Sequence, residues 1–122
     1  MRDFDIRDFH NELTSLESIE GLLGLAIVRK DGILNSALLP RDIDDRKFAA
    51  MVATMFGGLN AAIAPLKKEK LQILTVEYDQ YQVIAMEIND KFIIVSLLDI
   101  NTDYGLVLIE LEDFIRKIKN LI

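Results

Sequence analysis

Few side chains in this sequence are of the types that carry out covalent or acid–base chemistry. There is no cysteine and only one histidine, His10, so thiolate chemistry, most zinc and iron sites and a Ser-His-Asp triad are excluded. His10 lies on the polar side of an expected helix without partner groups, which favours a solvated surface residue. No nucleotide-binding, nucleophile-elbow, zinc-protease or calcium-loop pattern is present. We therefore expect no catalytic residue, no metal, no cofactor and no enzymatic activity of the chain itself.

Two groups of carboxylates remain as candidates for chemistry. Asp42, Asp44 and Asp45 could hold a divalent cation weakly, but capping of the helix that follows explains them with fewer assumptions. Glu77 and Asp79 flank Tyr78 at an expected turn and could act as paired carboxylates, but no third group lies beside them, so a solvated hairpin end is the simpler interpretation.

Composition and charge limit the class of protein. A chain of 122 residues, with 51% hydrophobic and 28% charged residues, predicts one globular domain over residues 1–122. The net charge of -6 has the wrong sign for a surface that follows phosphates, so nucleic acid is not an expected partner. Three acids in the first eight residues do not fit a secretory signal, and we expect the protein in the cytoplasm.

Hydrophobic periodicity predicts the order α-β-β-α-β-β-β-α, an α+β domain with helices on an antiparallel sheet. The first helix covers residues 5–17, with Asp5 as its cap. Asp31-Gly32 predicts a two-residue type I′ turn between strands 25–29 and 33–39, which would pair Val28 with Asn35. Strands follow at 71–78, expected at an edge, at 81–88, and at 92–98, expected at the centre. Thr102 or Asn101 should cap the last helix.

The window 48–66 is the most informative segment. Its 19 uncharged residues match the length of a membrane span, but six are alanine and glycine, asparagine and proline interrupt it, so we expect no membrane span. A bulky stripe runs along one side of the expected helix: Phe48, Val52, Met55, Leu59, Ile63 and Leu66. The opposite side carries small residues only: Ala50, Ala53, Gly57, Ala61 and Ala64.

A helix that is apolar all round must be covered on both sides, and one sheet covers only one of them. Small residues let another backbone approach closely, so the expected cover is a second copy of the chain. The alternatives are a terminal helix of the same chain, or alanine present only for helix propensity. Asn60 would bond either to backbone in the core or across the dimer axis. With the edge strand, the predicted dimer interface comprises Ala50, Ala53, Gly57, Asn60, Ala61, Ala64, Leu71, Ile73 and Thr75.

Several segments together resemble the roadblock family, which is named for dynein light chains and includes small prokaryotic regulators of Ras-like GTPases. They are residues 13–16 followed by Gly-Leu-Leu-Gly-Leu-Ala-Ile-Val-Arg-Lys-Asp-Gly at 21–32, the alanine-rich helix, Phe-Ile-Ile-Val-Ser-Leu-Leu at 92–98 and Tyr-Gly-Leu at 104–106. The resemblance implies a five-stranded antiparallel sheet with the long second helix on one face and the terminal helices on the other. It also implies a dimer formed through that helix and the third strand.

For function, the resemblance implies binding to a small Ras-like GTPase, either as an activating partner or as a scaffold, without enzymatic activity. An arginine that completes the GTPase site cannot be singled out among Arg2, Arg7, Arg29, Arg41, Arg46 and Arg116. The alternative is a profilin-like or PAS-like ligand-sensing module. Such a module needs an internal cavity, which Met51, Met55 and Met86 could line, although ordinary core packing is the simpler role for them.

Overall fold

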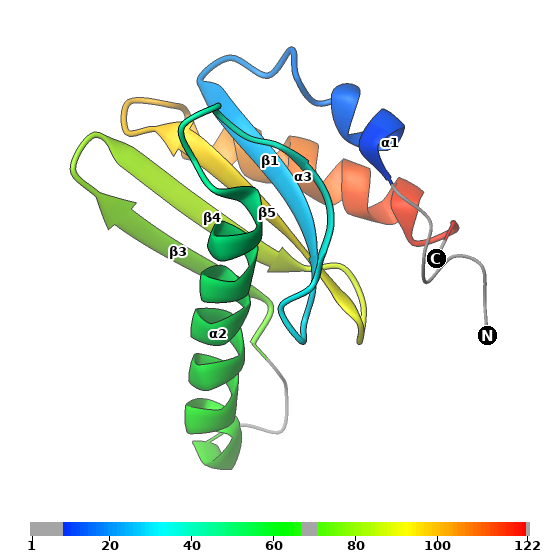
Figure 1. The fold of residues 1–122 in the computed structure, drawn as a ribbon, viewed down its shortest axis with the longest axis vertical. Coiled ribbons are helices and arrows are strands. Elements are labelled where there is room, and N and C mark those ends of the chain that lie inside the picture. The colour runs from blue at the N-terminus through cyan, green and yellow to red at the C-terminus, as the bar shows by residue number, and fades with distance from the viewer. Residues whose placement is uncertain (1–8, 67–70, 122) are drawn as a thin grey trace.

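The computed structural model describes residues 9–66 and 71–121. Along the chain, the described part contains α1 (His10–Thr14), β1 (Leu22–Arg29), β2 (Leu34–Leu38), α2 (Asp45–Ile63), the 3₁₀ turn η2 (Ala64–Leu66), β3 (Ile73–Tyr78), β4 (Tyr81–Glu87), β5 (Phe92–Asp99) and α3 (Tyr104–Ile118) (Figure 1). This order confirms the predicted α-β-β-α-β-β-β-α sequence of elements. The part of the first helix predicted before residue 9, including Asp5, lies outside the described residues.

The five strands form one antiparallel sheet in the order β2-β1-β5-β4-β3. Every residue of β5 except Asp99 is buried, because β5 lies at the centre of the sheet with helices on both faces. β3 lies at one edge, and only β4 pairs with it. The predicted central and edge positions of these two strands are therefore confirmed.

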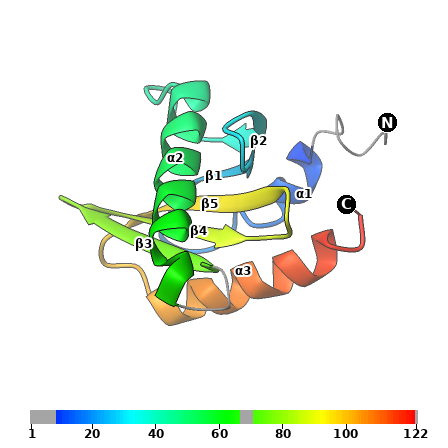
Figure 2. The ribbon, with the colours of Figure 1, turned by 90° about the horizontal axis from the view of Figure 1, so that it is seen from below.

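The helices lie on opposite faces of the sheet, as Figures 1 and 2 show together. On one face, α1 and α3 enclose a core that contains Phe9, Leu13, Leu111 and Phe92; the rings of Phe9 and Phe92 meet edge to face, with centroids 6.5 Å apart. On the other face, α2 packs against a second, smaller core. The predicted fold, one long helix on one face and the terminal helices on the other, is confirmed.

The first hairpin differs from the prediction by one residue. Val28 pairs with Leu34 rather than with Asn35, and a bulge interrupts the register just before it. A type I′ turn needs positive φ at both Asp31 and Gly32, but only Gly32 has it, at +98°. The connection is therefore a three-residue loop that ends in a left-handed glycine, and the predicted two-residue turn was wrong.

Aspartates cap both long helices. The side chain of Asp44 accepts a hydrogen bond from the Lys47 backbone N–H at 3.1 Å, as predicted. At α3 the cap is Asp103, which accepts from the Leu106 N–H, so the predicted caps Thr102 and Asn101 were wrong. The two residues belong instead to the turn between β5 and α3.

Candidate functional site

The inner face of α2 consists mainly of small and medium side chains that lie directly on the sheet. Ala49, Val52, Ala53 and Phe56 are buried there. They pack against the strand residues of the same core cluster: Ala26, Val28, Ala85, Ile93 and Val95. Alanine on both the helix and the strands permits a close approach, so small residues serve contact within the chain at this place.

This packing corrects the predicted orientation of α2. Ala53, assigned to the outward small-residue face, is only 5% exposed and belongs to the core under the helix. Met55 and Leu59, assigned to the same stripe as the buried Val52, instead lie at the surface. The helix is turned about its axis relative to the prediction, because both of its sides are apolar and the pattern alone did not select the inner one.

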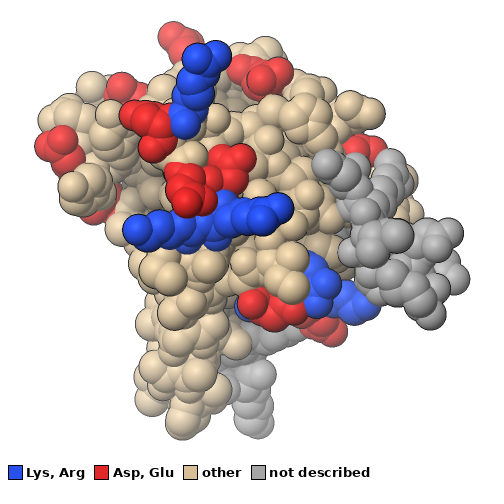
Figure 3. All heavy atoms as spheres, in the orientation of Figure 1, with Lys and Arg blue, Asp and Glu red and all other residues tan. Residues whose placement is uncertain are grey.

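The outer face of α2 carries a row of large apolar side chains in contact with solvent, here called the α2 stripe. It comprises Met51, Met55 and Leu59, spaced four residues apart, and Leu66 in η2; their exposed fractions are 54%, 43%, 39% and 77%. Spacing of three or four residues places such side chains on one side of a helix. In Figure 3 the lower part of α2 presents no charged side chain toward the viewer. The described part of the chain does not cover this surface.

The small-residue side of α2 faces the β1–β2 hairpin. A Cβ placed on Gly32 in the hairpin would lie 3.7 Å from the Ala50 Cα, and Gly57 lines a recess of about 40 Å³ together with Lys30. Met55 lies roughly 160° around the helix from Gly57, at 3.6 residues per turn. Since the hairpin lies on one side of α2 and β3 and β4 lie on the other (Figure 1), the α2 stripe is turned toward solvent and the β3 side.

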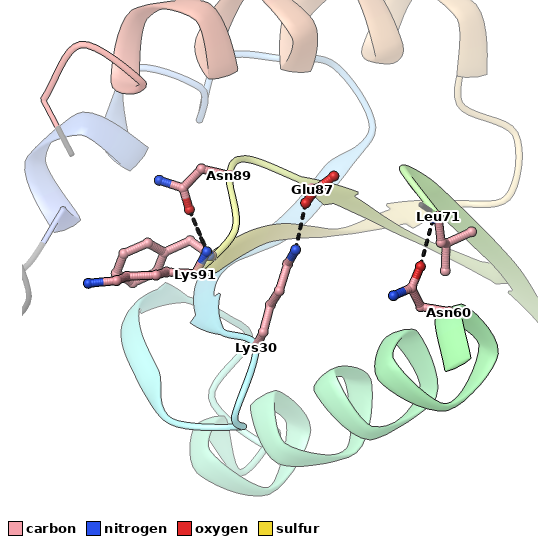
Figure 4. A network of polar contacts seen from close by, with 7 residues as sticks. Lys30, Asn60, Leu71, Glu87, Asn89 and Lys91 are labelled. Atoms are coloured by element: carbon pink, nitrogen blue, oxygen red, sulfur yellow. Dashed lines mark hydrogen bonds and ion pairs between the residues drawn. The ribbon is translucent and has the colours of Figure 1, made fainter. Parts of the chain in front are cut away.

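Asn60 joins the end of α2 to the start of the edge strand. Its side-chain oxygen accepts a hydrogen bond from the Leu71 backbone N–H at 2.7 Å (Figure 4). Of the two roles predicted for Asn60, a backbone hydrogen bond within the chain is the one observed. Leu71 packs partly buried against the core under α2, while Ala61 and Ala64 are exposed.

The edge strand β3 presents backbone groups that β4 does not use. The Glu87 N–H donates to the Gln72 carbonyl at 2.9 Å, and in an antiparallel ladder alternate residues bond to the same neighbour. Ile73, Thr75 and Glu77 therefore direct their backbone N–H and C=O groups toward the free edge. The Thr75 hydroxyl lies 2.9 Å from the Tyr104 hydroxyl of α3, so its side chain lies on the face opposite to α2.

An ion pair lies on the face of the sheet that α2 covers. The Lys30 ammonium lies 2.6 Å from a Glu87 carboxylate oxygen, with side-chain exposures of 29% and 11% (Figure 4). The Lys30 backbone N–H donates to the Lys91 carbonyl. The pair joins the end of β1 to the end of β4. The recess of about 40 Å³ beside Lys30 has room for water but not for a metabolite, so it is not a substrate site.

Other polar side chains take structural positions. Asp44 caps α2, and the buried Ser96 hydroxyl donates to the Ile84 carbonyl at 3.4 Å. Glu77 and Asp79 lie exposed at the end of the β3–β4 hairpin, as predicted. Within residues 9–66 and 71–121, no group of three or more histidine or acidic side chains is arranged to hold a metal ion.

Within the described residues, the three methionines suggested as the lining of a ligand-sensing cavity do not lie together. Met86 is buried in the core beneath α1 and α3, as expected for ordinary packing. Met51 and Met55 lie on the outer surface of α2 instead, so both the core packing expected for them and the alternative of a cavity lining were wrong.

The segment Asp45–Leu66 is long and apolar enough to cross a membrane. The mean hydropathy of its most apolar 18 residues is 1.5, and 22% of these residues are buried in the folded chain. Length and composition do not separate a span from a helix whose apolar surface another protein covers. Val52 and Phe56 pack on the sheet of the same chain, which favours the second interpretation.

Comparison with known proteins places these features in context. A family model described as "Roadblock/LC7 domain" matches residues 9–97. Among curated proteins, the chain is similar to the uncharacterized protein MJ1340 of Methanocaldococcus jannaschii, with 26% identity over 107 residues that cover 88% of this chain and 93% of that protein.

Solved structures show the same fold at low sequence identity. A Roadblock/LC7 domain from Streptomyces avermitilis superposes with a TM-score of 0.86 at 12% identity, covering 94% of this chain and 98% of that one. MglB of Myxococcus xanthus gives 0.80 at 15% identity, with coverages of 87% and 86%. A profilin from Schizosaccharomyces pombe gives 0.63 at 15% identity, with coverages of 88% and 93%.

Proposed function

The chain belongs to the Roadblock/LC7 domain family, and from that premise we propose that it acts in the cytoplasm as a non-catalytic homodimer that binds a small Ras-like GTPase. The observation that carries the dimer is the α2 stripe. Its three large side chains in α2, together with Leu66, form an apolar surface that the described part of the chain leaves open. Such rows on a folded domain mark a surface that a partner covers.

The second support for a dimer is the free edge of β3. Two copies could pair their β3 strands antiparallel about a two-fold axis at Thr75. Thr75 would then lie opposite its own copy and Ile73 opposite Glu77 of the other copy, so that all three residues with outward backbone groups form hydrogen bonds across the joint. The two sheets would then continue as one. The α2 stripe lies on the side of the helix toward β3, so this joint also brings the two stripes toward each other. The interface we propose is thus the α2 stripe with Ile73 and Thr75. The α2 stripe replaces the residues first predicted beside that strand: Ala50, Ala53, Gly57, Asn60, Ala61, Ala64 and Leu71.

Partner binding is proposed from family membership, which implies a Ras-like GTPase. The polar side chains support a regulator rather than an enzyme, because Asp44 caps a helix, Ser96 bonds to backbone, and Lys30 and Glu87 form an ion pair. The net charge of -6 would favour association with a partner surface that is basic. The rate of GTP hydrolysis by the GTPase, measured with and without the chain, distinguishes an activating partner from a scaffold.

A single-cysteine variant tests the β3 joint directly, because the native chain contains no cysteine. Thr75→Cys should form a disulfide-linked dimer under mild oxidation, since a residue on the axis lies opposite its own copy. Glu77→Cys is the matched control on the same strand. Its two copies would lie about 13 Å apart along the strand direction, four residues at 3.3 Å each, and should not cross-link. Equal cross-linking of both variants, or none, would contradict this joint.

The GTPase proposal is tested with the Ras-like GTPases encoded by the same genome. Each is loaded with GDP or with a non-hydrolysable GTP analogue and passed with the chain over a size-exclusion column. Co-elution in one nucleotide state, with or without faster GTP hydrolysis, supports a regulator or a scaffold. If every GTPase eluted separately from the chain in both nucleotide states, the proposed binding to a Ras-like GTPase would be refuted. The proposed dimer would be unaffected, because the cysteine variants test it separately.

A further inference from the structure

A second apolar surface lies on the face of the sheet opposite to α2. A groove of about 680 Å³ runs between the α1–β1 connection and the first half of α3. Ile19, Leu23 and Leu106 line it, and Ile109 lies beside Leu106 on α3. Leu23, Leu106 and Ile109 are 42%, 54% and 57% exposed, which is high for large apolar side chains. We call this surface the α3 groove.

The walls of the α3 groove are held in place by hydrogen bonds. The Gly21 carbonyl accepts from the Asp99 backbone N–H at 3.0 Å and from the Thr102 hydroxyl at 3.3 Å. The Asp103 side chain caps α3 beside them. These contacts join the α1–β1 connection to the β5–α3 turn, so the groove is shaped before any partner arrives.

The charged side chains that line the α3 groove all have the same sign. Its lining includes four carboxylates, Glu20, Asp99, Asp103 and Glu110, and no lysine, arginine or histidine. Asp99 and Asp103 accept hydrogen bonds from backbone N–H groups, and within the described part of the chain none of the four forms an ion pair. A groove lined by apolar side chains and carboxylates complements a segment that presents apolar side chains flanked by lysine or arginine.

We propose that the α3 groove docks an amphipathic, basic helix of another protein. A helix supplies apolar side chains at steps of three and four along one side, which suits a groove open at the surface and walled on one side by α3. Nucleic acid and anionic membranes carry the same sign of charge as the carboxylates of the lining and are not suitable occupants. This site is separate from the α2 stripe and does not depend on the proposed dimer or on its GTPase partner.

The test uses a fluorescent 18-residue peptide with leucine at helical spacing and lysine elsewhere, titrated with the full chain in an anisotropy assay. Glu110→Lys should weaken binding about tenfold, and Leu106→Ser should weaken it to a similar degree. Glu112→Lys is the matched control. It changes the net charge by the same amount, and Glu112 is also exposed on α3 but does not line the groove. It should leave the affinity within a factor of two.

Several outcomes would overturn the proposal. One is equal affinity of the Glu110→Lys and Glu112→Lys variants, and another is equal binding of a peptide with glutamate in place of lysine. Loss of binding in Met55→Ser but not in Glu110→Lys would place the peptide on the α2 stripe instead. If the chain assembles beyond a dimer as its concentration rises, and Glu110→Lys prevents this, the groove is occupied by a second copy rather than by another protein.

Discussion

Glutamate substitutions at two nearby positions of α2 should have very different effects on stability. Ala53 is 5% exposed in the core under the helix, whereas Met55, two residues further on, is 43% exposed. Ala53→Glu and Met55→Glu add the same charge to the same helix. A difference in their free energies of unfolding therefore reports which side of α2 lies on the sheet.

The expected difference follows from burial. At residue 53 the carboxylate would lose its water, at an effective penalty of several kcal/mol, and the larger side chain would add about 1–3 kcal/mol of overpacking. We expect a total loss of about 5 kcal/mol, a large part of the roughly 6–18 kcal/mol expected for 122 residues. At residue 55 the carboxylate stays in water, and the loss is about 1 kcal/mol of partial apolar contact.

Urea unfolding followed by far-UV circular dichroism measures this difference. Met51→Glu, also on the α2 stripe, is the control and should behave like Met55→Glu. Measurements at two protein concentrations tenfold apart separate the contribution of association, which depends on concentration, from that of the fold. If Ala53→Glu were no more destabilising than Met55→Glu, the orientation assigned to α2 would be refuted.

Three further predictions concern two glycine positions and the hydrogen bond between Asn60 and Leu71. Gly21→Ala should lower the free energy of unfolding by at least about 2 kcal/mol, because its φ of +87° is strained for alanine and a Cβ there would lie 2.1 Å from the Thr102 hydroxyl oxygen. Gly57→Ala should instead raise the free energy of unfolding by up to about 1 kcal/mol, since nothing lies within 4 Å of an added Cβ and alanine favours the helix. Urea unfolding of both glycine variants checks that the two changes have opposite signs. Asn60→Ala should lower the free energy of unfolding by about 1–2 kcal/mol by leaving the Leu71 N–H without its acceptor, and hydrogen exchange at Leu71 should become faster.

Much of the fold could be predicted from the sequence, because each element carries its own signal. The continuous apolar run of β5 indicated a strand covered on both faces, and the aspartates before the apolar helix indicated a cap, which Asp44 supplies. The first hairpin was placed correctly but its register was not. Asp31-Gly32 also fits a three-residue loop with positive φ at Gly32 alone, and the bulge that adjusts the pairing has no sequence signal of its own.

The candidate site was harder to predict than the fold. A helix that is apolar all round has no polar face to indicate which side is buried, so the bulky residues were expected to lie on the sheet. What decides the orientation is the facing surface: Ala26 and Ala85 on the strands leave room for Ala49 and Ala53 to approach closely. That complementarity joins residues far apart in the chain, and helical periodicity alone cannot reveal it.

The central claim, a dimer formed through the α2 stripe and β3, is tested most directly by the mass in solution. Light scattering across a dilution series should give twice the chain mass of 13.9 kDa for the wild type at micromolar concentration. Met55→Glu should remain folded and give the mass of a single chain. A wild type that stays at the mass of one chain at every concentration would contradict the account, because the α2 stripe would then be exposed without a second copy to cover it.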